Sequence, residues 1–303
     1  MKPIRVGTVL IAGIVLALSL DAEAGWSGRT GPIVLQDVDH CAAQPDAVAT
    51  FVDPNLEAAV RTALSIDADE DLTCRRLSSL TELTAEGAAI EDLRGIETLT
   101  GLAQLHLSDN PISDLSPLSS LSNLQTLYLW GGSVSDLTPL RDLEALTILH
   151  IGNNSIVDIS PLSDLTRLRD LSITHNAVTD LGPLKGLTDL EVLRIYNNPI
   201  SDISALRELT KLTELHIHDL PQLSDIQPLL ENTGLGEGDR VILMRSAVDC
   251  EDAAALQAKG VSVGSGCLGG VPMRWWGHIG IIAATAAMVA VLIRRHRNKP
   301  ASM

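Results

Sequence analysis

Apolar and polar positions along the middle of the chain follow a pattern that returns every 22 residues, between about residues 80 and 230. Each period opens with a short segment in which two apolar positions flank a polar one. The first apolar position is a leucine in Leu83, Leu105, Leu127, Leu149, Leu171, Leu193 and Leu215. Such alternation over three residues predicts a strand with two side chains pointing inward and one outward. A fixed period of this length predicts a solenoid whose strands stack into one parallel sheet.

After each predicted strand the chain has another inward apolar residue and then a short turn back. The inward positions are Ile90, Ile112, Val134, Ile156, Val178 and Ile200. The returning segment often has the form Ser-Pro-Leu, as at residues 116–118. Proline there favours brief turns of 3₁₀ type over long helices. The predicted fold class is therefore an α/β solenoid.

The repeat follows the spacing L-x-x-L-x-L-x-x-N-x-I-x-D-[LI]-x-x-L-x-x-L, as in residues 105–118 and again in residues 193–206. In this the chain resembles the 22-residue, internalin-like branch of the leucine-rich-repeat family. The resemblance implies a horseshoe with a parallel sheet on its concave face and short 3₁₀ or irregular segments on its convex face. It also implies that the asparagine column has a structural role, since an amide can both donate to and accept from backbone groups. That column consists of Asn110, Asn154, Asn176 and Asn198 and is interrupted at Ala88, Gly132 and Leu220.

A second polar column consists of aspartates at Asp92, Asp114, Asp136, Asp158, Asp180, Asp202 and Asp225. Seven aligned carboxylates suggest calcium binding as one interpretation. Each aspartate also comes just before a predicted helical turn, where its oxygens can accept free amides. Because calcium-binding repeats need several oxygen ligands and shaping glycines in each turn, we interpret this column as capping.

Two caps are predicted at the ends of the repeats. Asp53 followed by Pro54 predicts a helix start, and Leu56, Val60 and Leu64 then fall on one helical face. This stretch resembles the helical cap of internalin-like domains. At the other end, a strand around residues 241–243, a short helix from residue 250 to Gly260 and an edge strand to residue 267 predict a C-terminal cap.

The two ends of the chain carry export and membrane signals. Lys2 and Arg5, an apolar run and Ala22-Glu23-Ala24 predict a secretory signal cleaved after residue 24, with an uncleaved anchor as the alternative. Near the other end, tryptophans precede an apolar run that a basic cluster follows, which predicts a transmembrane helix with a cytoplasmic tail. A processed C-terminal sorting signal is the alternative. The expected divisions are signal peptide 1–24, leader and N-terminal cap 25–79, repeats 80–230, C-terminal cap 231–268, and anchor or sorting signal 269–303.

The cysteine count agrees with export. An even number of cysteines in an exported chain predicts disulfides, and four allow three connectivities. Locality favours one bridge in each cap, because the solenoid separates the two pairs: Cys41 with Cys74, and Cys250 with Cys267.

Composition narrows the classes of function. The chain has 303 residues, a formal net charge of −16, and only 2% aromatic residues. This acidity argues against nucleic acid as a partner, because phosphate contacts need a basic surface. Neither a serine elbow nor a phosphate-binding loop is found, and we expect no enzyme and no cofactor.

The candidate site lies in the outward positions of the predicted sheet, where the sparse aromatic residues gather. Aromatic, histidine and arginine side chains on an exposed sheet form a plausible recognition patch; its members are His106, Tyr128, Trp130, His150, Arg194, Tyr196, His216 and His218. Trp130-Gly131-Gly132 either opens a local depression or marks a degenerate repeat. His216 and His218 share a face within reach of one ion, but no further ligand completes a metal site.

These observations predict an exported, membrane-tethered binding protein, with its repeats in the periplasm or on the cell surface. The first hypothesis is that the concave face binds a protein partner, in recognition or adhesion. The second is that the face binds a glycan, with Tyr128, Trp130 and Tyr196 stacking on sugar rings. The third is a structural envelope component without a specific ligand.

Overall fold

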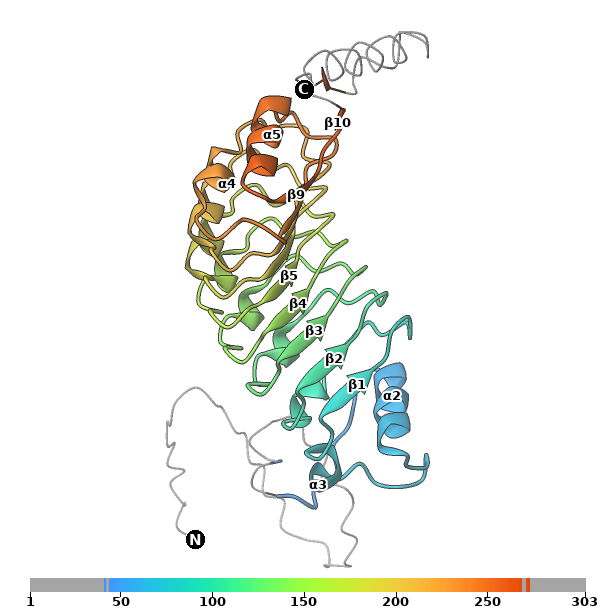
Figure 1. Cartoon of the computed structure of the whole chain (residues 1–303). Coiled ribbons are helices and arrows are strands. Elements are labelled where there is room, and N and C mark those ends of the chain that lie inside the picture. Colours follow the sequence, from blue (N-terminus) through green and yellow to red (C-terminus); the bar gives the residue numbers. More distant parts are fainter. Residues whose placement is uncertain (1–40, 42–43, 269–270, 273–303) are drawn as a thin grey trace, which may run out of the picture. The chain divides into compact units, whose positions relative to one another are not determined.

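The computed structural model describes residues 41, 44–268 and 271–272 of the chain. Within these residues, nine short parallel strands form one sheet in the order of the sequence (Figure 1). They are β1 Glu82–Thr84, β2 Gln104–His106, β3 Thr126–Tyr128, β4 Ile148–His150, β5 Asp170–Ser172, β6 Val192–Arg194, β7 Glu214–His216, β8 Arg240–Ile242 and β9 Ser262–Gly264. The central leucines pair in register from Leu83 with Leu105 to Leu193 with Leu215. The predicted solenoid with a parallel sheet is confirmed.

Short helical turns return the chain on the side away from the strands. They are η1 Ile96–Thr98, η2 Ser116–Leu118, η3 Thr138–Leu140, η4 Ser160–Leu162, η5 Gly182–Gly186, η6 Ser204–Glu208 and the α-helical turn α4 Gln227–Glu231. Proline stands in the first two positions of η2 to η5 and of α4. Because proline fixes φ and lacks a donor, it favours such one-turn segments, and the predicted 3₁₀ segments are confirmed.

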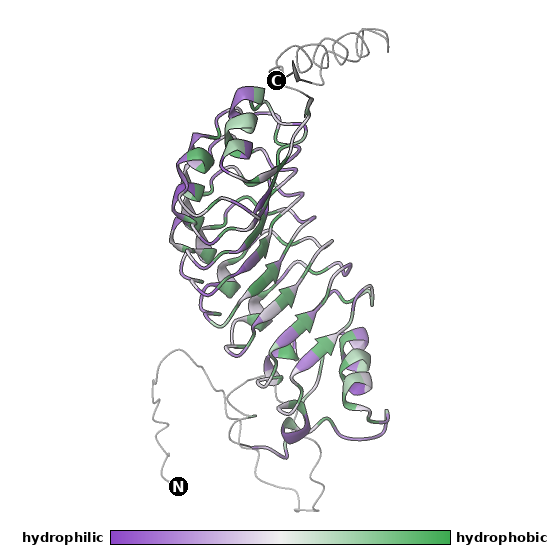
Figure 2. Cartoon of the chain, viewed as in Figure 1, coloured by the Kyte–Doolittle hydropathy of each residue, from purple (hydrophilic) through white to green (hydrophobic). Residues whose placement is uncertain are grey.

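The core is a stack of leucine and isoleucine layers between the sheet and these turns. In the fourth repeat Leu149, Ile156 and Leu162 have no exposed surface, and other repeats bury the same positions. Figure 2 shows apolar residues recurring in turn after turn of the solenoid. Each fully buried side chain of this kind contributes about 1.5–3 kcal/mol relative to an exposed one.

The asparagine column joins neighbouring repeats by hydrogen bonds. The Oδ1 atom of Asn154 accepts from the amide of Val134 at 3.0 Å, and its Nδ2 atom donates to the carbonyls of Leu129, Ile151 and Gly152. Asn110, Asn176 and Asn198 make equivalent bonds. These bonds satisfy backbone groups that the strands leave unpaired, so the predicted structural role is confirmed.

The aspartate column caps the helical turns. Asp114, Asp136 and Asp158 each accept from the amide two residues further on, at 2.8 Å. Asp92, Asp180, Asp202 and Asp225 do the same. Six of these amides belong to the first residue of a helical turn, so the capping interpretation is confirmed there, whereas the amide of Arg94 lies before η1.

Helix α2, Pro54–Leu64, forms the N-terminal cap beside β1 (Figure 1). The Oδ1 atom of Asp53 accepts from the amides of Asn55 and Leu56, while its Oδ2 atom accepts from the amides of Glu91 and Asp92. One carboxylate thus starts the helix and fastens it to the first repeat. Helix α3, Cys74–Leu77, carries the disulfide from Cys41.

The C-terminal cap continues the sheet rather than ending it. Strands β8 and β9 pair in parallel with the strands before them, and helix α5, Cys250–Ala258, lies between them in sequence. The Nζ atom of Lys259 donates to the carbonyls of Leu229, Leu230 and Asn232, which secures the end of α4. The second disulfide joins Cys250 to Cys267, next to the hairpin of β10, Cys267–Leu268, and β11, Val271–Pro272. Both predicted bridges are present.

The predicted signal peptide and most of the predicted anchor, residues 1–24 and 273–303, lie outside the described residues. Among the residues that are described, no helix has the length and apolar character needed to cross a bilayer.

Candidate interaction face

The sheet has one face toward the core and one away from it, which we call the open face. Its side chains come from the outward strand positions, the residues just after the strands, and the left-handed residues that follow. Left-handed φ values recur at this last position in Gly87, Asp109, Gly131, Asn153, His175, Asn197, Asp219 and Arg245. Glycine, asparagine and aspartate tolerate this conformation best. The turn therefore fixes where the open face ends in every repeat.

A continuous chain of contacts crosses five strands of the open face. The His106 ring stacks on Tyr128 with centroids 4.7 Å apart, and Tyr128 meets His150 edge to face at the same distance. The Nε2 atom of His150 lies 3.0 Å from Oδ1 of Asp170, and that oxygen also accepts from Arg194 at 2.7 Å. Register explains the chain: His106, Tyr128 and His150 pair side by side, while Asp170 lies two residues before Ser172, the residue that pairs with both His150 and Arg194.

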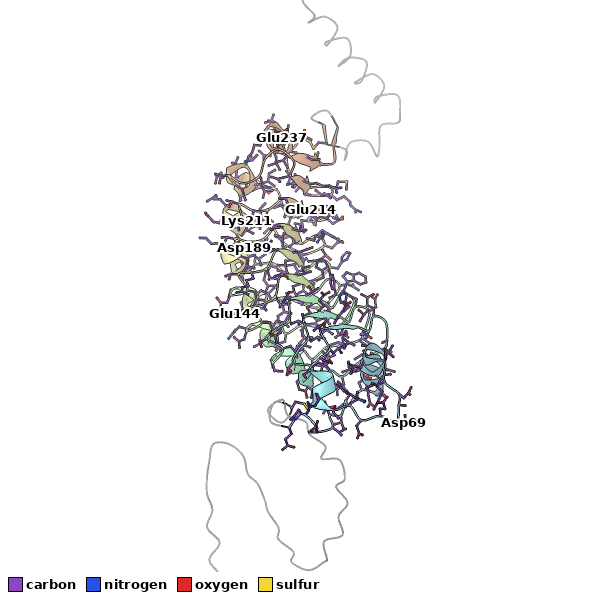
Figure 3. All side chains as sticks on the ribbon, turned by 60° about the horizontal axis from the view of Figure 1, so that its bottom comes forward. Asp69, Glu144, Asp189, Lys211, Glu214 and Glu237 are labelled. Atoms are coloured by element: carbon purple, nitrogen blue, oxygen red, sulfur yellow. A yellow bond between two sulfur atoms is a disulfide. The ribbon has the colours of Figure 1, made fainter. Side chains whose placement is uncertain are left out.

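A second group of rings lies at the end of β7 and just after β5, β6 and β7. Tyr196 stacks on His218 with centroids 4.1 Å apart and meets His175 edge to face at 5.2 Å. His216 lies 6.1 Å from His218, centroid to centroid, and its Nε2 atom is 2.6 Å from Oε1 of Glu214. Figure 3 shows Glu214 on the strand side, away from Asp189 and Lys211 near the 3₁₀ turns.

Trp130 is the one large aromatic side chain of the described residues that is well exposed, at 41%. A β-carbon at Gly152 would lie 2.7 Å from Cδ1 of Trp130 and 2.6 Å from Oγ1 of Thr174. The indole therefore packs against the backbone of Gly152 in the next repeat, and a side chain at this position would displace it. The residue that makes room for Trp130 is Gly152. The depression predicted from the sequence involved Gly131 and Gly132 instead.

The surroundings of Asp170 and His218 shift the pKa values of both side chains. Burial works to raise the pKa of Asp170, but the hydrogen bond from His150 and the charge of Arg194 outweigh it, so this pKa is lowered. Burial lowers the pKa of His218, against the opposing charge of Asp219. Within the part of the chain that the structure describes, Nε2 of His106 and Nδ1 of His218 are buried and have no hydrogen-bond partner.

All eight predicted site residues lie on the open face, in the two groups just described or beside them. Sequence reasoning missed Asp170, Glu214 and Gly152. The first two occupy the outward strand position before each central leucine, which carries the same period as the predicted positions. Their signal was therefore present in the sequence.

The described residues contain no group of three or more histidine, cysteine, aspartate or glutamate side chains arranged to hold a metal ion. Two surface hollows lie at the ends of the solenoid. One, of about 740 Å³, is lined by Met244, Val248 and Ala253 in the C-terminal cap, and the other, of about 600 Å³, lies between α2 and β1. Neither involves the aromatic residues of the open face.

Comparison with known proteins identifies the family to which this fold belongs. Residues 100–142, 144–186 and 188–231 match the family model described as leucine-rich repeats (2 copies). Internalin C2 from Listeria monocytogenes str. 4b F2365 is 32% identical over 70% of this chain and 94% of its own, with a TM-score of 0.51. The chain belongs to the internalin-like leucine-rich-repeat family.

Other internalins align at lower similarity. InlF of the same strain is 25% identical over 70% of this chain and 88% of its own, with a TM-score of 0.39. The functional domain of InlJ from Listeria monocytogenes, which includes a cysteine ladder, is 24% identical over 68% of this chain and 53% of its own, with a TM-score of 0.48. No curated protein matches the chain. The predicted membership of the internalin-like family is confirmed, and repeat proteins of this kind use extended sheet surfaces for binding.

Proposed function

We propose that this internalin-like protein is exported and binds a protein partner through the open face, without catalysing a reaction. One observation carries the proposal: both tyrosines of the chain, the described tryptophan and all five described histidines lie on this face. Aromatic residues and arginine are the types that dominate binding energy at protein interfaces. Here they are held in place by stacking and hydrogen bonds, which reduces the entropy lost on binding.

Export is supported by the two disulfides, since such bonds persist in oxidising compartments. We propose the domain division given above, with residues 1–24 removed and residues 269–303 serving as an anchor or a sorting signal. Recovery of the protein with Gly25 as its first residue tests the cleavage. An N-terminus at Met1 in the exported protein contradicts it.

Trp130, Tyr128 and Tyr196 are the residues on which the binding proposal is tested. We expect the triple variant Tyr128→Ala, Trp130→Ala, Tyr196→Ala to lose at least about 90% of partner capture, because hot-spot truncations cost 2 kcal/mol or more each. The measurement is the amount of protein that the soluble fragment 25–270 pulls down from a cell lysate. The matched control is Arg141→Ala, Val157→Ala, Lys185→Ala, three exposed positions off the open face. Equal capture by the two variants refutes a role for the open face.

A glycan is the second candidate ligand, favoured by the exposed indole of Trp130, since aromatic faces pack against apolar surfaces. However, His106 covers one face of Tyr128, and His218 covers one face of Tyr196. Less free ring surface therefore remains for sugars, which supports the protein partner. Binding on a glycan array that disappears in the same triple variant, without capture of any protein, favours the glycan instead.

A further inference from the structure

Histidines are distributed very unevenly over this chain. The described residues contain five of its eight histidines, and all five lie on the open face: His106, His150, His175, His216 and His218. Histidine is the side chain whose charge normally changes between about pH 5 and 8. The open face is therefore the part of the described solenoid whose charge responds most to mild acidification.

Each of these rings has titratable or charged neighbours on the strands beside it. His150 faces Asp170 and, through it, Arg194. His216 contacts Glu214 and lies near His218. The charged and titratable groups facing the other rings are Glu86 and Tyr128 for His106, Tyr196 and His218 for His175, and Asp219, Arg245, His175, His216 and Tyr196 for His218.

The sign of the charge on this face reverses when the rings gain protons. Near pH 7.5 the carboxylates of the face outnumber its arginines: Glu82, Glu86, Asp109, Asp170, Glu214 and Asp219 against Arg194, Arg240 and Arg245. Protonation of the four histidines other than His218, whose pKa is lowered, would already give seven positive groups against six carboxylates. Carboxylate oxygens lie 3.0 Å from Nε2 of His150 and 2.6 Å from Nε2 of His216. The protein would then carry a cationic open face on a chain of formal charge −16.

We propose that the open face binds an acidic segment of a protein partner at mildly acidic pH and releases it near neutral pH. This inference rests on the proposed function and adds the partner's chemistry and the condition for binding. Charge complementarity supports it, because like charges repel acidic partners at neutral pH and opposite charges attract them after protonation. The rings already lie on the binding surface, so no conformational change is required.

Poly-L-aspartate is a suitable probe, since its carboxylates stay ionised over the tested range. The full chain is immobilised, and the dissociation constant is measured at about pH 5.5 and 7.5 at constant ionic strength, because screening alters such binding. We expect binding about tenfold tighter or more at the lower pH. Equal affinity at the two pH values, or no binding at either, overturns the proposal. Binding of dextran sulfate without binding of poly-L-aspartate overturns the choice of an acidic polypeptide.

Two variants locate the effect. In His150→Gln, His175→Gln, His216→Gln we expect the pH effect to fall below about threefold, whereas Arg141→Gln, Arg167→Gln, Lys185→Gln keeps it. In His150→Lys, His216→Lys, whose charges persist at neutral pH, we expect binding at pH 7.5 as well. If the triple glutamine variant keeps the pH dependence of poly-L-aspartate binding, the proposal is overturned, whatever its affinity. Thermal unfolding confirms that each variant is folded. Loss of capture in the aromatic triple variant without any pH effect leaves the proposed function standing and refutes this inference alone.

Discussion

The open face and the turn side of the solenoid come from the same 22-residue unit, yet they use it differently. On the turn side every repeat from the first to the seventh has the same aspartate accepting the same amide. On the open face, the last residue of each strand changes from His106 to Tyr128, His150, Ser172 and Arg194 in successive strands. The uniform contacts stabilise the stack, and the varied side chains give the surface an individual chemistry.

The two sides also differ in the pH range to which they respond. Hydrogen bonds from Thr138 lower the pKa of Asp136, and those from Ser160 lower the pKa of Asp158, so these caps stay charged below the ordinary value of 3.8. Histidine is the side chain whose charge ordinarily changes between about pH 5 and 8, and all five described histidines lie on the open face. Mild acidification should therefore change the open face while leaving the caps of the turn side intact.

The largest effect should come from the shared core. Leu149→Ala removes a side chain with no exposed surface, and we expect it to lower the free energy of unfolding by about 3 kcal/mol. Trp130→Ala on the open face should cost about 1 kcal/mol or less, because the indole is 41% exposed. Urea unfolding followed by circular dichroism measures both. At a temperature where both variants are folded, Leu149→Ala should keep partner capture and Trp130→Ala should lose it. The reverse order of stabilities would contradict the division between the two regions.

A smaller loss should follow removal of one asparagine from the column. Asn154→Ala leaves the Val134 amide and three carbonyls without their side-chain partner, which should cost about 2 kcal/mol. The control is Asn123→Ala, whose exposed amide makes one bond to the carbonyl of Thr100 and should matter little. Amide hydrogen exchange at Val134 should rise in the first variant alone. Unchanged exchange there would show that the asparagine does not protect the backbone.

Asp53 gives an effect of about 1–2 kcal/mol, the usual size for a lost helix cap. Burial works to raise its pKa, but hydrogen bonds from the amides of Glu91, Asn55, Asp92 and Leu56 outweigh it, so the pKa is lowered. The folded state therefore binds the proton less readily than the unfolded one. Stability from this group is complete above the ordinary value of 3.8 and is lost as the pH falls through the lower folded value. Asp53→Ala should thus destabilise at pH 7 and differ little from the wild type near pH 2. An equal deficit at both pH values would contradict this origin.

The repeated residues made the fold predictable, because each column of leucine, asparagine or aspartate has one task in every repeat. Both disulfides were also predictable, since the solenoid keeps the two pairs of cysteines apart. The contacts of Asp170 were not predicted, because its partners His150 and Arg194 are 20 and 24 residues away in the sequence. Only stacking in register brings them together. The contact of the Trp130 indole with Gly152 depends on the same register of neighbouring strands. It also depends on the orientation of the ring, which the sequence does not specify.

The smallest effect concerns His218, and it tests whether the open face differs from the turn side in its titration. Burial lowers the pKa of this histidine from its ordinary value of 6.5, so the unfolded state binds the proton more readily. Stability is then unaffected well above pH 6.5 and falls slightly as the pH drops below it, towards the lower folded value. His218→Gln should change the pH dependence of unfolding by about 0.5 kcal/mol or less, as surface substitutions usually do. The sharper measurement is the NMR titration of the His218 ring, whose midpoint should lie below that of an unfolded peptide. A midpoint at or above that reference would mean that the stacked ring is not desolvated and that Asp219, 3.8 Å away, controls its charge instead.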